Sequence, residues 1–400
     1  MNIKRLVLGT AAGALAVTGA QAADLPVVVE PVDYVRVCDA FGVGFYYIPG
    51  TETCLRVAGR VRVDYNVFFD FDDFEVIPGL GYEDDGDDGY RFRARAYIYM
   101  DSRTNTEFGL LRTFTEVYFT SQFGGELSTT LNRAFIQFGG LTFGRTQSFY
   151  DFLDASYGSS QFFNANFSDT TTNVLAYTFA FGKGFSASIS LEDELSRRAN
   201  LGIAFGAYQG ARIPDIVANV RVDQGWGSAQ VMAAGHYVDD LVSGDSEYGF
   251  AVGAGVNVNV PFGNGTQVGI QGGYTHGALS YVASGATGGN PVIGVAAADG
   301  IVTLGGDLEL VDAFSVSGGF STSFTPTVSL GVQAGYLFVD HAERAGISYD
   351  FQNITLDGFL GYSPVSGFVL GVGAQYMYVD NDDFDDGSAL STFFRAQRTF

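Results

Sequence analysis

The chain has 400 residues, among them 54 glycines, 36 phenylalanines and 22 tyrosines. Its 44 acidic residues outnumber 21 basic ones, which gives a formal net charge of −23. Because glycine and aromatic residues are poor helix formers, this composition disfavours a helical protein. The many aromatic residues exclude a disordered chain, and the negative charge excludes a basic nucleic-acid-binding protein.

The first 22 residues have the features of a secretory signal peptide. Lys4 and Arg5 form a charged start, an apolar stretch follows, and Ala-Gln-Ala at 20–22 is a small-x-small cleavage site. The alternative is a membrane anchor, but glycines interrupt the apolar stretch, which is short for a spanning helix of ~20 residues. We expect residues 1–22 to be removed and residues 23–400 to be exported as one domain.

Two cysteines, Cys38 and Cys54, lie near the start of the exported chain. In an oxidising compartment, an even pair this close in sequence suggests one disulfide. Two free buried thiols are the alternative, and a metal site is disfavoured because no histidine or third cysteine is nearby. We treat 23–54 as an N-terminal, disulfide-bearing segment of this single domain.

From residue 55 onward, the dominant pattern has a period of two. Between Leu55 and Val67 the odd positions are almost all apolar and the even positions are mostly charged or polar. This alternation is typical of a half-buried strand, and it recurs at 90–100 and at 368–376. The runs are roughly 10–15 residues long, about twice the length of a globular strand. Spanning a membrane takes ~9–11 tilted residues, so the length favours a transmembrane barrel over a sandwich.

The pattern predicts an all-β protein, a transmembrane antiparallel β-barrel. Seventeen segments qualify as strands, but a bacterial single-chain barrel has an even number. We discard 301–311, which interrupts an Ala/Gly-rich loop, and keep sixteen. These are 55–69, 89–101, 107–121, 128–139, 140–146, 173–181, 184–193, 213–222, 226–238, 248–261, 265–277, 312–325, 327–339, 348–362, 367–380 and 388–400.

The connections between these strands alternate in length. Short turns are predicted at 102–106, 182–183, 223–225, 262–264, near 326 and at 363–366. Long loops are predicted at 70–88, 146–172, 194–212, 239–247, 278–310 and 381–387. Short turns on one side and long external loops on the other are typical of outer-membrane barrels.

The arginines are unevenly distributed along the chain. Eleven of the eighteen in residues 23–400 lie between Arg36 and Arg145, many on the polar faces of two neighbouring predicted strands. Because a charge facing lipid costs ~2–4 kcal/mol at mid-bilayer, these side chains should face a watery lumen. Either each one pairs with a carboxylate and merely solvates the wall, or together they form a positive strip lining a pore. We expect the second, with the strip formed by Arg60, Arg62, Arg91, Arg93, Arg95 and Arg112.

The loop at 146–172 carries seven aromatic residues together with Asp151, Asp154 and Asp169. A fully hydrated loop would not need so many aromatic side chains, so it should pack against a surface. Folded into the barrel, it would set its carboxylates opposite the arginines and form a constriction that sorts solutes by size and charge. The alternative is an external loop packed on its neighbours or on other subunits.

Acidic residues also cluster in the loops at 70–88 and 382–386. The simplest interpretation is solvated loop charge. Alternatively, divalent cations could bridge these loops to anionic lipopolysaccharide, or the acidic side chains could raise the cation concentration at the pore mouth. Neither a dedicated metal site nor a cofactor is predicted. The three histidines, His236, His276 and His341, are widely spaced, and no serine–histidine pair or phosphate-binding loop is marked. The sequence therefore does not indicate an enzyme.

The segment 34–56, which reads YVRVCDAFGVGFYYIPGTETCLR, closely resembles the N-terminal signature of the alphaproteobacterial porin family. The ending FRAQRTF at 394–400 is similar to the C-terminus of that family, and FGRTQ at 143–147 leads into the long loop in the same way. The resemblance implies a sixteen-strand, homotrimeric general-diffusion channel in the bacterial outer membrane, with the third external loop folded into the pore. It also implies the pairing of Cys38 with Cys54.

These observations predict an outer-membrane channel for passive diffusion of small hydrophilic solutes and ions. The opposed arginines and loop carboxylates predict at most weak cation selectivity, despite the strongly negative net charge. Two alternatives remain. One is a substrate-specific sugar or anion porin in which solutes slide along the aromatic side chains of the loop, and the other is a structural or adhesin barrel.

Overall fold

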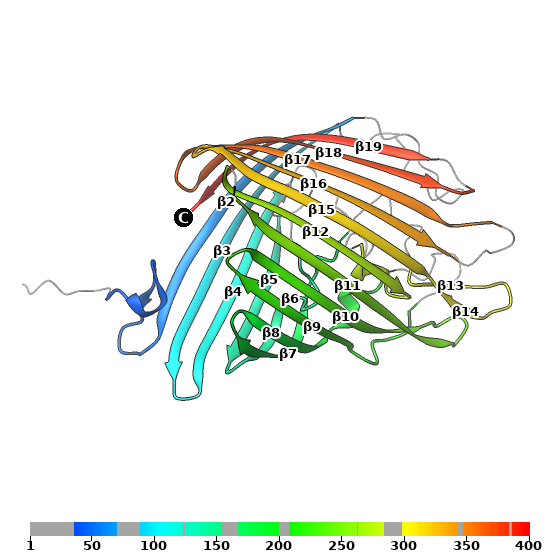
Figure 1. Ribbon diagram of the computed structural model, residues 1–400, viewed down its shortest axis with the longest axis horizontal. Helices are drawn as coiled ribbons and strands as arrows, with labels where there is room; N and C mark the ends of the chain where they lie inside the picture. The colour runs from blue at the N-terminus through cyan, green and yellow to red at the C-terminus, as the bar shows by residue number, and fades with distance from the viewer. Residues whose placement is uncertain are drawn as a thin grey trace, which may run out of the picture.

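The computed structural model describes residues 36–69, 89–122, 125, 127–153, 167–199, 208–261, 263–283, 298–341, 347–383 and 386–400. The predicted signal peptide at 1–22, the acidic loop at 70–88 and Asp154 lie outside these residues. The described chain forms one closed barrel of sixteen antiparallel strands (Figure 1). The strand number, the antiparallel order and the exclusion of 301–311 from the barrel are therefore confirmed.

The barrel strands follow one another around the ring in chain order. They are β2 (Cys54–Phe69), β3 (Tyr90–Thr106), β4 (Gly109–Gln122), β5 (Ser128–Phe138), β6 (Leu141–Gln147), β7 (Thr171–Gly182), β8 (Phe185–Glu192), β9 (Asp215–Gln224), β10 (Gly227–Asp239), β11 (Ser246–Val260), β12 (Asn264–His276), β15 (Asp312–Thr325), β16 (Val328–Asp340), β17 (Phe351–Val365), β18 (Phe368–Asn381) and β19 (Gly387–Thr399). Segment 301–311 instead contributes to a separate hairpin, β13 (Gly300–Val302) with β14 (Leu308–Leu310).

The ring closes where the last strand pairs with the first barrel strand. β19 is antiparallel to β2, with Phe394 opposite Tyr65. Beyond β19, the Phe400 and Gly59 backbones exchange two hydrogen bonds of 2.9 Å. A Cβ at Gly59 would lie 2.5 Å from the Phe400 ring, so a larger residue here would require the Phe400 side chain to move. Closure removes the free sheet edges that an open sheet would expose.

The alternation of residue types sorts side chains between the two faces of the barrel wall. On β3, Phe92 and Ile98 point outward and are 52% and 45% exposed, whereas Arg93 between them points inward and is 7% exposed. The apolar outer surface and polar inner surface match a barrel that crosses a membrane around a hydrated lumen.

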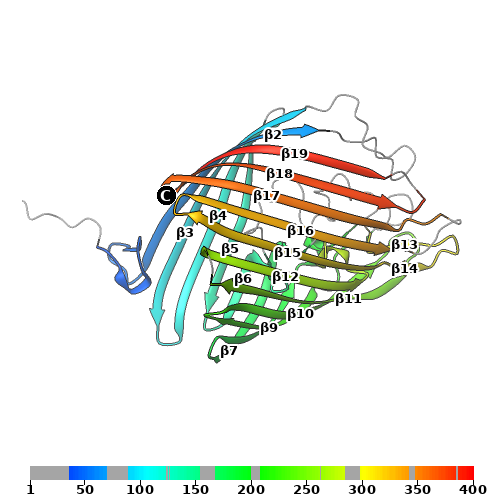
Figure 2. The ribbon, with the colours of Figure 1, turned by 45° about the horizontal axis from the view of Figure 1, so that its top comes forward.

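Short turns and long connections segregate to opposite ends of the barrel, as the sequence predicts (Figures 1 and 2). One predicted turn is wrong: 102–106 belongs to strands, because β3 runs to Thr106 and β4 begins at Gly109. The polar run is hydrogen-bonded across the pair, with Ser102 Oγ 2.6 Å from Thr113 Oγ1. A polar sequence at a strand end outside the apolar band therefore resembles a turn without forming one.

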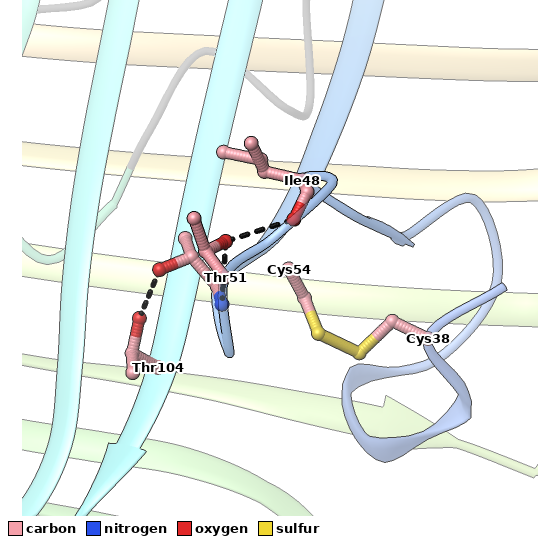
Figure 3. Close-up of a disulfide and its surroundings, with 6 residues drawn as sticks. Cys38, Ile48, Thr51, Cys54 and Thr104 are labelled. Carbon is pink, nitrogen blue, oxygen red and sulfur yellow. Dashed lines mark hydrogen bonds between the residues drawn. A yellow bond between two sulfur atoms is a disulfide. The ribbon is translucent and has the colours of Figure 1, made fainter. Parts of the chain in front are cut away.

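The N-terminal segment folds as a small appendage at the short-turn end (Figure 1). Cys38 and Cys54 form a disulfide with their Cα atoms 6.0 Å apart, which confirms the predicted pairing (Figure 3). The segment carries a 3₁₀ turn (η1, Asp39–Phe41) and a two-residue strand, β1 (Tyr46–Tyr47), which pairs with β2. Thr53 Oγ1 lies 2.9 Å from Thr104 Oγ1, which ties the start of β2 to β3.

Candidate functional site: the barrel lumen

The six arginines predicted to line a pore all come from β2, β3 and β4, on the inward face of the wall. The register places inward side chains in rows across neighbouring strands. One row contains Arg395, Asp64 and Arg93; the next contains Gln397, Arg62, Arg95 and Thr120; a third contains Thr399, Arg60, Tyr97 and Tyr118. Arg91 and Arg112 lie on the same face, toward opposite ends of the barrel.

Several inward arginines are neutralised by carboxylates. Asp64 accepts bonds from Arg93 at 3.0 Å and from Arg395 at 2.8 Å, and all three side chains are nearly inaccessible. Asp101 likewise pairs with Arg103 at 2.8 Å and Arg112 at 3.0 Å. Such pairs are held by fixed, charge-assisted hydrogen bonds. These carboxylates therefore tie four arginines to the wall.

Other arginines are held by aromatic rings and neutral hydrogen-bonding groups. The Arg60 guanidinium lies 3.9 Å from the centre of the Tyr97 ring, and that of Arg95 lies 4.9 Å from the Tyr118 ring. The Arg91 guanidinium lies 5.8 Å from the Phe68 ring. Cation–π contacts orient a guanidinium without cancelling its charge.

The first residues of the long loop after β6 pack on the inner face of the opposite wall. The Asn219 side chain donates to the Phe149 carbonyl, Gln230 Nε2 donates to the Tyr150 carbonyl at 3.1 Å, and Leu153 N–H donates to Gln271 Oε1 at 3.0 Å. These three wall residues come from β9, β10 and β12. In the ring of sixteen, β10 stands eight strands from β2 in either direction.

Glycines on β11 make room for this loop. A Cβ at Gly255 would lie 2.4 Å from the Phe152 ring, and one at Gly253 would lie 3.0 Å from the Tyr150 hydroxyl. These two glycines therefore have a packing role, because an inward side chain at either position would collide with the loop.

Asp151 is the anchor of the loop rather than an exposed carboxylate. Its Oδ1 lies 3.0 Å from Nη2 of Arg197, and its Oδ2 accepts from the Thr170 N–H at 2.7 Å. Arg197, from the connection after β8, is fully buried and also lies 4.2 Å from the centre of the Tyr281 ring. Burial alone would lower the pKa of Arg197, but Asp151 raises it above its ordinary value. Arg197 therefore keeps its charge although it is buried.

Asp169 lies at the far end of the same loop and is partly exposed. Its Oδ1 accepts a hydrogen bond of 2.6 Å from Gln147 Nε2, and Gln147 also donates to Asp151. Of the three predicted loop carboxylates, the structure therefore brings Asp151 and Asp169 to one glutamine, and Asp154 lies outside the described residues.

A second buried network joins two further loop segments to the wall. Asp299 accepts from the backbone N–H of Ala199 at 2.7 Å, from the Leu279 N–H at 2.8 Å and from the Tyr208 hydroxyl at 2.6 Å. Burial raises the pKa of Asp299 above its ordinary value, and it raises that of Tyr208 well above. His236 of β10 lies between Asp299 and Asp215, 2.8 Å from the latter.

An apolar cluster lies beside this network, on one side of the barrel interior. Inward residues of β16 to β19, including Leu337 and Met377, are covered by Leu279 and Val282 from the connection after β12. The interior is therefore divided: the β15–β19 side is packed with loop residues near its long-loop end, and the β2–β4 side carries the arginines.

Sequence reasoning missed Arg197, His236 and Asp299 as organisers of the lumen. The polar run Glu-Leu-Ser-Arg-Arg at 194–198 was a weak signal, because buried loop residues leave no periodic pattern.

Among the described residues, no helix has the length and apolar character needed to cross a bilayer. Within the same residues, no cluster of three or more histidine, cysteine, aspartate or glutamate side chains could hold a metal ion.

The fold and the lumen define a class of protein. A closed barrel of sixteen antiparallel strands with an apolar outer surface and a polar inner surface is a multi-pass channel of the bacterial outer membrane. Comparison with known proteins agrees, because residues 24–398 match the porin subfamily. The chain belongs to this porin family and is a channel for passive diffusion across the outer membrane.

Individual relatives and solved structures are consistent with this assignment. "Porin Omp2b" from Brucella suis biovar 1 (strain 1330) is 36% identical over 298 residues, which cover 69% of this chain and 74% of that protein; the protein of the same name from Brucella abortus (strain 2308) matches equally. The outer membrane channel DcaP of Acinetobacter baumannii shares the fold with a TM-score of 0.70 at 17% identity, covering 88% of this chain and 99% of that one. OmpF of Salmonella typhi, in complex with daunomycin, has a TM-score of 0.55 at 11% identity, covering 86% of this chain and 98% of that one.

Proposed function

We propose that this porin sorts solutes at a constriction with two opposed signs. One side is the positive wall formed by Arg60, Arg62, Arg91, Arg93, Arg95 and Arg112. The other is the loop at 146–172, folded into the lumen and carrying Asp151, Asp154 and Asp169. Small hydrophilic solutes and ions pass passively, selected by size and by the transverse field. No catalytic step and no cofactor are part of the proposal.

One observation carries the proposal: the loop is bonded to the wall that faces the arginines. Phe149, Tyr150 and Leu153 are hydrogen-bonded to β9, β10 and β12, and β10 is diametrically opposite β2 in the strand order. A loop fixed there narrows the lumen from the side opposite the positive wall. Within it, Asp151 acts through its buried pair with Arg197, and Asp169 supplies negative charge toward the solute.

The test is a pair of neutralising substitutions with opposite expected signs. In a planar bilayer under a KCl gradient, Arg91→Gln is expected to shift the reversal potential toward cations. Asp169→Asn is expected to shift it toward anions. If neither variant moves the reversal potential, the two side chains do not border the path of the ions and the proposed constriction is wrong.

We further propose a homotrimer, supported by a polar patch on the outer surface. Arg145 of β6 is the register partner of Asn173 of β7, and the alternation places both on the outward face. A charged side chain facing lipid is destabilising, so a second copy of the chain covering this position would relieve that cost. The outer membrane protein OmpT of Vibrio cholerae, a fold neighbour at 11% identity, is described in a trimer form. Light scattering in detergent should give a trimeric mass for this chain, and a monomeric mass would contradict the proposal.

The acidic residues between β18 and β19 support a smaller proposal, contact with lipopolysaccharide through divalent cations. Asp382 and Asp383 lie at the long-loop end of the barrel. Asp383 accepts a hydrogen bond from the Ser348 N–H, and Asp382 accepts one from the Ser348 hydroxyl. Chelation of divalent cations should release bound lipopolysaccharide from the purified protein. Retention at an unchanged level would contradict the bridging role.

A further inference from the structure

The inward arginines divide into two groups by the chemistry of their partners. Arg93 and Arg395 share Asp64, and Arg103 and Arg112 share Asp101. Three others, Arg60, Arg62 and Arg95, have no carboxylate within ion-pair distance in the part of the chain that the structure describes. We call these three the unneutralised arginines.

Each unneutralised arginine is positioned by neutral groups. Arg62 Nε donates to Gln397 Oε1 at 2.9 Å, and Arg95 Nε donates to Thr120 Oγ1 at 3.1 Å. Both bonds use Nε, and Arg95 is also hydrogen-bonded to the Tyr97 side chain. A guanidinium carries five N–H donors, so each group keeps donors for a further acceptor. Arg60 is held over the Tyr97 ring, and its buried Nε has no hydrogen-bond partner among the described residues.

The register brings two of these charges side by side. Arg62 and Arg95 are directly opposite each other across β2 and β3, in a row otherwise formed by Gln397 and Thr120. Like charges directly opposite each other in a sheet are destabilising. The carboxylate of the neighbouring row, Asp64, is already bonded to two other arginines.

Taken together, these contacts describe a prepositioned receptor for an oxyanion. Guanidinium groups bind carboxylate and phosphate oxygens through two parallel hydrogen bonds. A dianion can use the remaining donors of Arg62 and Arg95 at once and relieve their mutual repulsion. A halide ion has no oxygen atoms to accept two parallel hydrogen bonds, so it is attracted only as a point charge.

We propose that Arg60, Arg62 and Arg95 form a binding site in the channel for small oxyanions carrying two negative charges. Hydrogen phosphate, phosphate monoesters and short dicarboxylates share this chemistry. The inference rests on the proposed function only in requiring that β2 and β3 border the path of the solute. The site gives such anions a saturable step in passage, whereas other solutes diffuse without one.

The experiment measures block of single-channel current by added anions in a fixed KCl background. Hydrogen phosphate, malonate and acetate are titrated separately at pH 8, where phosphate is mainly doubly charged. For the wild-type channel, saturable block is expected with both dianions and not with acetate. Block by phosphate alone would assign the site to phosphates, and block by malonate alone would assign it to dicarboxylates.

Variants decide whether the proposed residues form the site. Arg62→Gln and Arg95→Gln should each raise the half-blocking dianion concentration about tenfold, because each removes a charge-assisted bond. The matched control is Arg103→Gln, on the same strand as Arg95 but outside the proposed positive wall; it leaves Asp101 paired with Arg112 and should change the block less than threefold.

Three results would overturn the inference. They are absence of saturable dianion block in the wild type, equal block by acetate, and equal loss of block in Arg103→Gln and Arg95→Gln. Its failure is distinguishable from failure of the proposed constriction, because Arg91→Gln and Asp169→Asn can still shift the KCl reversal potential when phosphate produces no block.

Discussion

Two arginine sites in this barrel show how one residue type serves two purposes. Arg197 is fully buried, pairs with Asp151 and is surrounded by hydroxyl groups of Ser168 and Thr170. Arg62 is partly exposed and bonded to the neutral Gln397. The first holds loop segments together, and we propose that the second keeps its charge available to a solute.

The difference lies in the desolvation of each charge. A buried arginine needs a carboxylate and further hydrogen bonds, because an uncompensated buried charge is strongly destabilising. An arginine facing a hydrated lumen does not need a carboxylate, since water solvates it. In our proposal, pairing with a carboxylate separates arginines that stabilise the channel from arginines that act on the solutes passing through it.

The largest effect on the current is expected from Arg197→Met. The change leaves Asp151 buried without its cation, which costs about 3–5 kcal/mol, and should loosen the packing of the loop on β9–β12. Single-channel recordings should show higher conductance and more frequent fluctuation. The control is Arg198→Met, whose partner is Glu194. If both variants conduct like the wild type, Arg197 does not hold the loop.

A smaller effect is expected from Asp64→Asn, which turns two paired arginines into unpaired ones. Arg93 and Arg395 lose their shared carboxylate while the side-chain shape is kept. The reversal potential in a KCl gradient should move toward anions. Glu116→Gln serves as the comparison, because its arginine partner, Arg133, is 3.8 Å away and the change should be smaller. A shift toward cations in Asp64→Asn would contradict the assignment.

The smallest effect on the current is expected from Cys38→Ser combined with Cys54→Ser. The disulfide spans a sequence separation of 16, and its loss should destabilise the N-terminal segment by roughly 3 kcal/mol. Hydrogen exchange should become faster in 36–53, whereas conductance and selectivity stay unchanged because the segment lies outside the lumen. A change in selectivity would mean that this segment influences the pore.

The barrel itself could be predicted from the sequence because its signal is local and repeated. A period of two places Arg60 and Arg62 on one face and Val61 and Val63 on the other, whatever the rest of the chain does. Strand ends were harder to predict, because the polar run at 102–106 resembles a turn although it continues β3. Hydrogen bonds across the strand pair, not local propensity, fix that boundary.

The organisation of the lumen could be predicted only in part. The inward direction of the arginines follows from the alternation, but their division into paired and unneutralised groups depends on register. The contacts of Arg395 with Asp64 and of Arg62 with Gln397 both depend on the pairing of β19 with β2, which joins residues more than 300 positions apart. Contacts such as Arg197 with Asp151 join loops that share no periodic pattern.

The central claim is that the unneutralised arginines supply the attraction of this channel for anions. It is tested most directly by the reversal potential of Arg60→Gln/Arg62→Gln/Arg95→Gln in a KCl gradient at ~0.1 M salt, where screening acts over about 10 Å. The account predicts a clear shift toward the cation equilibrium potential relative to the wild type. A reversal potential equal to that of the wild type would contradict it.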